Sequence, residues 1–464
     1  MPQIADSKAY KIKLTFVLTL TFTMTTVKDS LPSFDAKSAP DPQLIDACVH
    51  CGFCLATCPS YRVIGKETDS PRGRIYLMDS INEGKILLSP AVVQHFDSCL
   101  GCLACVTTCP SGVQYDKLIS ATRFQVERNH RRPLLEKLLR WFIFHTFPYP
   151  HRLRALLVPL FVYQKLGLQK LERSLKILAK ILPQPLSAME SILPEISLNS
   201  FQDNFPEIIP AEGKKRYRVG LILGCVQRVF LPNINQATIR VLTANGCEVV
   251  IPNQQGCCAA LSHHQGQEWQ TKLLAKQMID HFADTGVDYI IINASGCGHT
   301  LKEYGRILHD DPQYAPKAQA FASKVRDVQE FLDQVGLTVQ LNAISDRPLA
   351  IAYQDACHML HGQKISLEPR RLLRQIPQVQ IKEPVDAALC CGSAGVYNIF
   401  QAETAEELGR QKAENLLAVG ADLIASANVG CTLQIKKHLE LLDAPVPIYH
   451  PMELLDLAIR GEQL

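Results

Sequence analysis

Eight of the 17 cysteines stand in two short runs that share the spacing Cys-x2-Cys-x2-Cys-x3-Cys-Pro. Two-residue spacers let three thiolates surround one iron–sulfur cubane, while the fourth cysteine of each run points to the other cubane. The pattern therefore predicts two [4Fe–4S] clusters. The expected ligands are Cys48, Cys51, Cys54 and Cys109 for the first cluster, and Cys99, Cys102, Cys105 and Cys58 for the second.

A zinc site or a set of buried structural cysteines is the alternative for these runs, because tetrahedral zinc also uses Cys-x2-Cys pairs. Zinc does not require a third cysteine at the same spacing or a fourth one before proline, and this chain has both features twice. We therefore favour iron–sulfur clusters. Gly52 and Gly101 stand inside the two runs and allow the backbone to approach a cluster closely.

Most of the remaining cysteines form two matching sets in the C-terminal half of the chain. Each set has one cysteine, then an adjacent pair, then a last cysteine. The sets are Cys225, Cys257, Cys258 and Cys297, and Cys357, Cys390, Cys391 and Cys431. Their closely matching intervals indicate two homologous domains. We treat these eight residues as candidate ligands of an additional metal or iron–sulfur centre, and Cys247 as a small buried hydrophobe.

Short apolar runs precede these cysteines and predict buried strands, with helical segments between them. The strands are expected at Tyr217–Leu223, Glu248–Ile251 and Tyr289–Ile292, and again at Leu349–Tyr353, Val379–Ile381 and Leu423–Ala425. Helices are expected at Asn233–Asn245 and Trp269–Thr285. Alternating strands and helices predict a parallel sheet in each domain. The paired sets of cysteines follow the carboxyl ends of the strands, where open α/β sheets bind ligands.

We predict an α/β fold with an N-terminal α-helical ferredoxin-type domain and duplicated parallel-sheet domains. The helical type is favoured because the spacer between Cys58 and Cys99 contains two helix-like segments, Arg74–Gly84 and Ala91–Phe96. The expected boundaries are 1–40 for a flexible N-terminal extension, 41–130 for the ferredoxin-type domain, 131–215 for a helical linker, and 216–340 and 341–464 for the two sheet domains.

The segment Asp69–Arg74 (DSPRGR) has two interpretations that the sequence leaves open. Its arginines either offset cluster charge or dock a partner, or they are solvated residues at a helix start capped by Ser70 and Pro71.

The chain is 47% hydrophobic and 20% charged, with a net charge of +3, so nothing in it indicates nucleic-acid binding. An odd number of cysteines with this spacing indicates thiolate ligands in a reducing compartment. We expect a cytoplasmic protein, with peripheral contact at the inner membrane face as the alternative. The apolar segments Leu134–Phe147 and Leu153–Leu168 are too short to span a bilayer. They form either a buried helical bridge or an interfacial helix pair.

The motifs CVHCGFCLATCPSY, DSPRGRIYLM and CLGCLACVTTCPSGVQYDKLI resemble the iron–sulfur subunit of glycolate oxidase (glycolate dehydrogenase). The duplicated domains resemble the CCG domains of that family. Relatives occur in heterodisulfide reductases, anaerobic glycerol-3-phosphate dehydrogenases and lactate-utilisation proteins, which remain the alternatives. The resemblance implies an oxidoreductase subunit that passes electrons from a flavin-binding dehydrogenase subunit to a quinone or another acceptor. FAD is expected on the partner only, because no G-x-G-x-x-G follows a strand here, and no catalytic residue is assigned to this chain.

The family's CCG domain ends in Cys-x-x-Cys, and this chain lacks the final cysteine in both domains. Thr300 and Gln434 stand where it is expected. Four cysteines in each domain still suffice for a metal centre, with His299 or His358 as candidates to complete the shell. The alternative is a vestigial or interface-forming domain.

Overall fold

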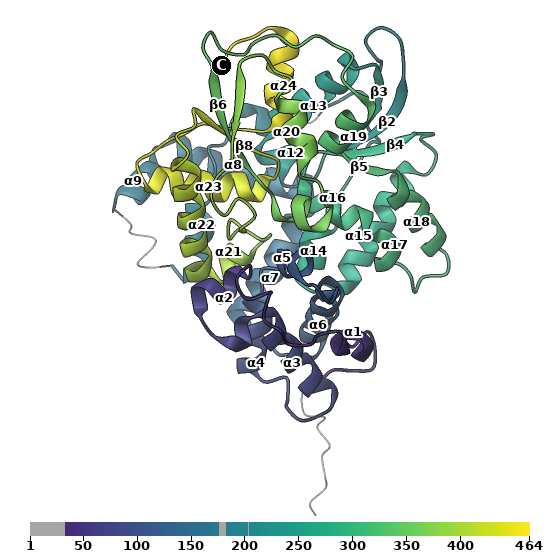
Figure 1. Cartoon of the computed structure of the whole chain (residues 1–464), viewed down its shortest axis with the longest axis vertical. Helices are drawn as coiled ribbons and strands as arrows, with labels where there is room; N and C mark the ends of the chain where they lie inside the picture. The colour runs from purple at the N-terminus through teal and green to yellow at the C-terminus, as the bar shows by residue number, and fades with distance from the viewer. Residues whose placement is uncertain (1–32, 176–181, 203) are drawn as a thin grey trace, which may run out of the picture. The chain divides into compact units, whose positions relative to one another are not determined.

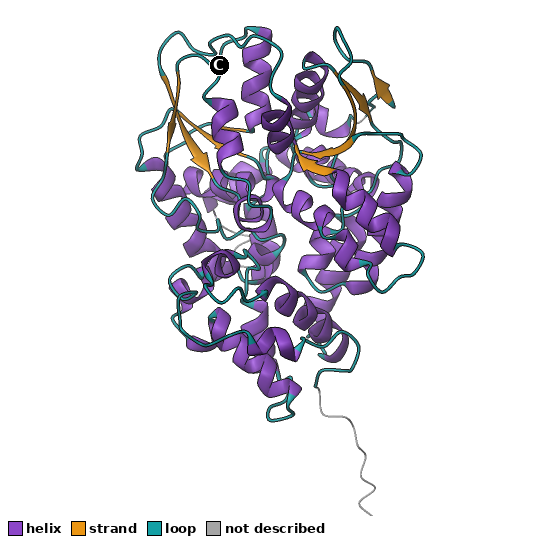
Figure 2. Cartoon of the chain, turned by 45° about the vertical axis from the view of Figure 1, so that its right-hand side comes forward, coloured by secondary structure: helices purple, strands orange, loops and turns teal. Residues whose placement is uncertain are grey.

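The computed structural model describes residues 33–175, 182–202 and 204–464. Most of the predicted N-terminal extension falls on residues 1–32 and lies outside the described residues. Within the described ranges, the N-terminal domain is built from helices, and sheets begin only in the cysteine-rich region (Figures 1 and 2). The predicted fold class is confirmed.

The helices of the N-terminal domain are short, and several begin at proline, a residue favoured at the first helical position. They are α1 (Pro42–Asp46), α2 (Pro59–Ile64), η1 (Glu67–Asp69), α3 (Pro71–Asn82), α4 (Pro90–Asp97), α5 (Ala104–Thr108) and α6 (Tyr115–Asn129). Met78, Phe96 and Leu118 are fully buried at their centre. Five of the cysteines pack in or against this core, namely Cys48, Cys54, Cys99, Cys105 and Cys109, and of these only Cys105 lies within a helix, α5.

The linker consists of helices, and the first two of them pack against the cysteine-rich region. The linker helices are α7 (Leu134–Thr146), α8 (Pro150–Lys165), α9 (Leu168–Leu175), α11 (Gln184–Ser191) and η2 (Leu198–Phe201). Ile143 of α7 packs with Ile399 of the second cysteine-rich domain. Leu157 of α8 packs with Val229 of the first. The linker therefore bridges the two cysteine-rich domains. No helix in the described ranges is both long enough and apolar enough to cross a membrane.

Each cysteine-rich domain has a sheet of parallel strands. The order of these strands is the same in both domains, and the first sheet has an additional strand at one edge. The first sheet runs β1-β3-β2-β4-β5 and consists of β1 (Ile208–Ile209), β2 (Tyr217–Ile222), β3 (Cys247–Val250), β4 (Tyr289–Ile292) and β5 (Val325–Asp327). The second runs β7-β6-β8-β9 and consists of β6 (Leu349–Gln354), β7 (Val379–Lys382), β8 (Leu423–Ser426) and β9 (Ile448–Tyr449). Only β1 is antiparallel to its neighbour.

In the first domain β2 lies between β3 and β4, and in the second β6 lies between β7 and β8, so the strand order reverses at the carboxyl ends of β2 and β6. Such a reversal is the usual ligand position in open α/β sheets. Cys225 follows β2 and Cys357 follows β6, which places the first cysteine of each set at this point. The shared topology supports the duplication that the cysteine spacing predicted.

Helices and turns cover both sheets. In the first domain these are α12 (Gln227–Phe230), α13 (Pro232–Ala244), α14 (Ala260–His264), α15 (Glu268–Phe282), α16 (Ser295–Lys302), α17 (Tyr304–Ile307), α18 (Ala315–Lys324) and α19 (Val328–Val335). In the second they are η3 (His358–Gly362), α20 (Leu367–Leu373), α21 (Tyr397–Phe400), α22 (Ala402–Leu417), α23 (Val429–Leu441) and α24 (Pro451–Arg460).

One hydrophobic core runs through both cysteine-rich domains. Val219 of β2 and Ile351 of β6 belong to the same buried cluster. The C-terminal helix α24 packs on α13 of the first domain, where Arg240 donates to both carboxylate oxygens of Asp456 at 2.8 and 2.6 Å. The shared core and this contact therefore hold the carboxyl ends of β2 and β6 in a fixed position relative to each other.

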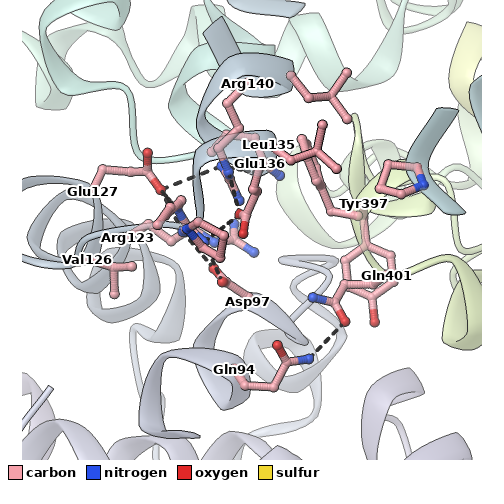
Figure 3. A pocket seen from close by; sticks show the side chains of 16 residues that line it. Gln94, Asp97, Arg123, Val126, Glu127, Leu135, Glu136, Arg140, Tyr397 and Gln401 are labelled. Atoms are coloured by element: carbon pink, nitrogen blue, oxygen red, sulfur yellow. Dashed lines mark hydrogen bonds and ion pairs between the residues drawn. The ribbon is translucent and has the colours of Figure 1, made fainter. Parts of the chain in front are cut away.

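An ion-pair network joins the linker to the N-terminal domain. Arg132, in the turn between α6 and α7, contacts Asp97 and Glu136 at 2.8 Å and Glu127 at 2.6 Å. Arg140 adds a contact to Glu136 at 2.8 Å. Figure 3 shows these acidic residues and Arg140 lining a pocket between α4, α6 and α7. Burial disfavours the Asp97 carboxylate, but the arginines outweigh burial, so its pKa is lowered.

We expect Arg132→Met to lower the free energy of unfolding of the helical region by about 1–3 kcal/mol, because it leaves the half-buried carboxylate of Asp97 without its ion-pair partner. Urea unfolding followed by the fluorescence of Trp141, on α7, measures this change. Arg131→Met is the control, since Arg131 is the exposed neighbour. Equal unfolding midpoints for the two variants would contradict the role of the network.

Candidate iron–sulfur and cysteine-rich site

The cysteines assigned to the first cluster lie at a partly exposed edge of the N-terminal domain. Cys51 is exposed, and Cys48, Cys54 and Cys109 are half-buried. Burial raises the pKa of the Cys48 thiol, and the charges of Cys109 and Cys51 raise it further. Burial also raises the pKa of Cys54, again with a contribution from Cys48. The fold thus brings Cys109 of the second run to the cysteines of the first.

The cysteines assigned to the second cluster are buried. Burial raises the pKa of Cys105 well above its ordinary value, and the charges of Cys102, Cys99 and Cys58 act in the same direction. Cys58 of the first run is therefore a close neighbour of the second run. This exchange of the fourth cysteine is the arrangement that the spacing predicts for two neighbouring cubanes.

Several donors surround the sulfur of Cys99. The amide of Gly101 donates to it at 3.4 Å and the hydroxyl of Tyr115 at 3.6 Å. Burial opposes ionisation of this thiol, but Arg74 and Arg123 outweigh burial, so the pKa of Cys99 is lowered. Such hydrogen bonds and charges tune the potential of a cluster held by the same sulfur.

The structure agrees with only part of the second interpretation of the DSPRGR segment, the capped helix start with solvated arginines. Ser70 caps α3 as expected, accepting from the amide of Gly73 at 3.1 Å. Arg74, however, is 0% exposed, so the expectation of solvated arginines is wrong for this residue. Its guanidinium donates to Ser60 and Ser98 and lies 3.6 Å from Asp69. Burial disfavours its charge, but Cys99, Tyr115, Cys58 and Asp69 outweigh burial and raise its pKa.

The donor set suits an iron–sulfur cluster. Thiols that are buried beside one another resist ionisation, as Cys102 and Cys105 do. A bound metal replaces the protons and supplies the positive charge that four adjacent thiolates require. Soft thiolate donors select iron–sulfur clusters or zinc over hard cations. The buried arginine beside Cys99 and Cys58 reduces the remaining negative charge.

The first set of paired cysteines forms a chain of sulfur contacts. The Sγ atoms of Cys225 and Cys257 are 3.3 Å apart. Cys257 and Cys297 each donate a hydrogen bond to Cys258. These bonds raise the pKa of Cys257 and Cys297 and lower that of Cys258, which accepts from both neighbours. The fold thus brings all four predicted residues together.

The second set forms a matching chain through Cys357, Cys390, Cys391 and Cys431. Asn428 donates to the sulfur of Cys431 at 3.3 Å. Lys412 lies beside Cys391 and Cys431 and is 1% exposed. Burial lowers the pKa of its ammonium, and the charges that the nearby cysteines can carry oppose this shift. The sequence does not identify Lys412 as a site residue, because the pattern of α22 is that of an ordinary charged helix.

The two candidate histidines contact groups other than the cysteines. Nε2 of His358 lies 2.9 Å from the carbonyl oxygen of Gly101 and 3.1 Å from Nε2 of His264. The ring of His299 meets His358 edge to face. Burial lowers the pKa of His358 to about 3, so its ring is neutral. These contacts join both cysteine-rich domains to the turn that holds the second run.

The second cysteine-rich set lies next to the second ferredoxin run. Cys102 and Cys390 belong to one buried cluster, and the charge of Cys390 helps to raise the pKa of Cys102. Tyr397 of the same cluster donates to the carbonyl oxygen of Ser98 at 3.1 Å. Both paired sets also line one cavity of about 500 Å³. The sequence does not reveal this proximity, which depends on domain packing.

Comparison with known proteins agrees with this arrangement. Residues 44–113 match the 4Fe-4S dicluster domain, residues 219–302 and 351–436 match the cysteine-rich CCG domain, and residues 135–193 match the linker region of the glycolate oxidase iron–sulfur subunit. The chain is 39% identical to the probable glycolate oxidase iron–sulfur subunit of Bacillus subtilis, across 88% of this chain and 92% of that protein. This chain belongs to the family of glycolate oxidase iron–sulfur subunits.

Two other relatives show how far the likeness extends. The glycolate oxidase iron–sulfur subunit of Escherichia coli is 34% identical across 92% of this chain and 97% of that protein. Lactate utilization protein A of Bacillus subtilis is 28% identical across 52% of this chain and 99% of that protein. The glycolate oxidase type therefore accounts for nearly the whole chain, and the lactate type for about half of it.

If Cys99 and Cys58 ligate a cluster as predicted, we expect Arg74→Met to lower its midpoint potential, because the change removes a buried positive charge beside their sulfurs. The shift should be on the order of 50–100 mV, or roughly 1–2 kcal/mol. Redox titration followed by EPR measures it.

Two further variants control for structural damage. Arg74→Lys retains the charge and should retain most of the potential, and Arg62→Met removes a partly exposed arginine that pairs with Asp386. If Arg74→Met leaves the potential unchanged while both clusters remain, Arg74 does not tune the cluster.

Proposed function

We propose that this chain is the electron-transfer subunit of a glycolate oxidase complex, in which a flavin-binding subunit oxidises glycolate to glyoxylate. The two ferredoxin-type cysteine quartets carry this proposal, because they suit single-electron centres and stand in a chain of this family. The FAD belongs to the partner. The subunit passes the electrons to a quinone or another acceptor.

The proposed ligands of the first [4Fe–4S] cluster are Cys48, Cys51, Cys54 and Cys109, and those of the second are Cys99, Cys102, Cys105 and Cys58. Their support is the mutual effect of these thiols on one another's pKa. When bound, the clusters supply one-electron oxidation and reduction. The protein's own residues exclude water from the second quartet, donate to its sulfurs, and balance its charge with Arg74 and Arg123.

Electrons enter at the first quartet in this proposal, because that is the exposed one. Cys51 is exposed, and Val49 and Phe53 beside it are 68% and 65% exposed. Exposed apolar residues next to a redox centre suit a docking flavin subunit. The second quartet is buried and adjoins Cys390, so the second cysteine-rich domain is the next step of the proposed electron path. We propose a further iron–sulfur centre there or in the first cysteine-rich domain.

We also propose that the linker touches the membrane surface. Two of its helices, α7 and α8, expose apolar side chains, namely Leu134, Leu138, Trp141, Val158 and Val162. Exposed basic residues accompany these side chains, namely Arg131, Lys137, Arg152 and Lys165, and α8 contains no acidic residue. Helices of this kind bind anionic lipid surfaces through apolar burial and charge.

The test is electron delivery into the chain from the assembled complex. With glycolate as the substrate, we expect both clusters to become reduced, as seen by EPR after rapid freezing, and lactate and glycerol 3-phosphate to reduce them more slowly. Cys51→Ser should impair this reduction at the first cluster. Faster reduction with glycerol 3-phosphate or lactate than with glycolate would assign the chain to the alternative dehydrogenases.

A further inference from the structure

A cavity of about 500 Å³ lies between the linker and the two sets of paired cysteines. The linker contributes apolar side chains to one wall, among them Phe142, Leu157, Leu160 and Met189. The opposite wall contains all eight paired cysteines. A volume of this size suits a small organic ligand, and its position puts such a ligand against the end of the proposed electron path.

Three buried polar atoms in side chains that line the cavity have no hydrogen-bond partner among the described residues. They are Oε1 of Gln227, Oγ of Ser295 and Oδ1 of Asn398, and the residues are 2%, 1% and 7% exposed. Buried polar atoms are nearly always paired, so these three indicate a missing ligand.

The amide nitrogens of two of these residues already have partners. Gln227 donates to Asn293 at 2.6 Å and Asn398 donates to Gln434 at 2.9 Å. What remains free is therefore two carbonyl acceptors and one hydroxyl. A ligand that satisfies them must have an apolar body and oxygen atoms that both accept and donate hydrogen bonds.

We propose that this cavity is the binding site of a quinone-class acceptor. This inference rests on the proposed function, because it needs electrons delivered by the iron–sulfur centres. The hydroxyl of Ser295 donates to a carbonyl oxygen of the oxidised ring. The carbonyls of Gln227 and Asn398 accept from the hydroxyl groups of the reduced ring. The free atoms thus match both redox states of a quinone.

The reaction balances without a further reagent. The quinone gains two electrons, which arrive singly from the iron–sulfur centres, and two protons, which come from solvent water, and it leaves as the hydroquinone. The same linker helices line the cavity with Leu157 and Leu160 and expose Val158 and Val162 on the surface that we propose to touch the membrane. One side of α8 thus lines the proposed quinone site, and the other side belongs to the surface proposed for the membrane, where a lipid-soluble quinone resides.

The test uses the full chain with its clusters, reduced by dithionite and freed of excess reductant, with decylubiquinone as the probe. Leu160→Trp adds bulk to the cavity wall, and the control Leu166→Trp makes the same change at an exposed residue just after α8 that does not line the cavity. We expect Leu160→Trp to slow reoxidation by decylubiquinone at least about tenfold, and to abolish quinone retention in equilibrium dialysis. Leu166→Trp should behave as the wild type.

A second variant tests the polar contact. Ser295→Ala should raise the decylubiquinone concentration needed for half-maximal reoxidation by about tenfold. Reoxidation by ferricyanide and the EPR signals should stay unchanged in all variants, because they depend on the relay and not on the cavity. Unchanged quinone kinetics and retention in both Leu160→Trp and Ser295→Ala would overturn the site while leaving the relay intact. A wild-type chain without reducible clusters would overturn the relay itself.

Discussion

Adjacent thiolates repel one another, and burial makes this repulsion stronger. The quartet formed by Cys58, Cys99, Cys102 and Cys105 meets this cost in three ways: through hydrogen bonds to sulfur, through the buried guanidinium of Arg74, and through the metal charge that the ligand set is suited to bind. The short helices of the N-terminal domain are arranged around this requirement. Arg74 itself is tolerable in the core only because Asp69 and the sulfurs compensate its charge.

Cysteines also lie next to one another in the cysteine-rich domains, but there they are arranged differently. There the sulfurs lie at the carboxyl ends of parallel strands and contact one another in two chains of four. The shared core and the contact of α13 with α24 hold the two chains on one cavity. Cys390 beside Cys102 then links this region to the ferredoxin-type domain. Distance between redox centres thus becomes a consequence of how the domains pack.

Much of this arrangement could be predicted from the sequence, because metal ligation and strand burial leave local signals. The Cys-x2-Cys spacing identified both ferredoxin runs, and the matching intervals identified the duplication. The strands β1, β5 and β9 were missed, since strands of two or three residues have too few side chains for a recognisable pattern. The burial of Arg74 and Lys412 was not predictable, because it depends on partners distant in sequence. The cavity shared by the two cysteine sets was not predictable either, because its lining residues are distant in sequence.

The central claim is that the two ferredoxin-type runs bind redox-active clusters. The most direct measurement is iron and acid-labile sulfide per chain in anaerobically purified protein, with EPR after reduction by dithionite. The account predicts at least about eight iron and eight sulfide per chain, with the signals of two interacting cubanes. Amounts nearer to twelve would place a further centre in the cysteine-rich domains. Zinc in place of iron, with no EPR signal, would contradict the account.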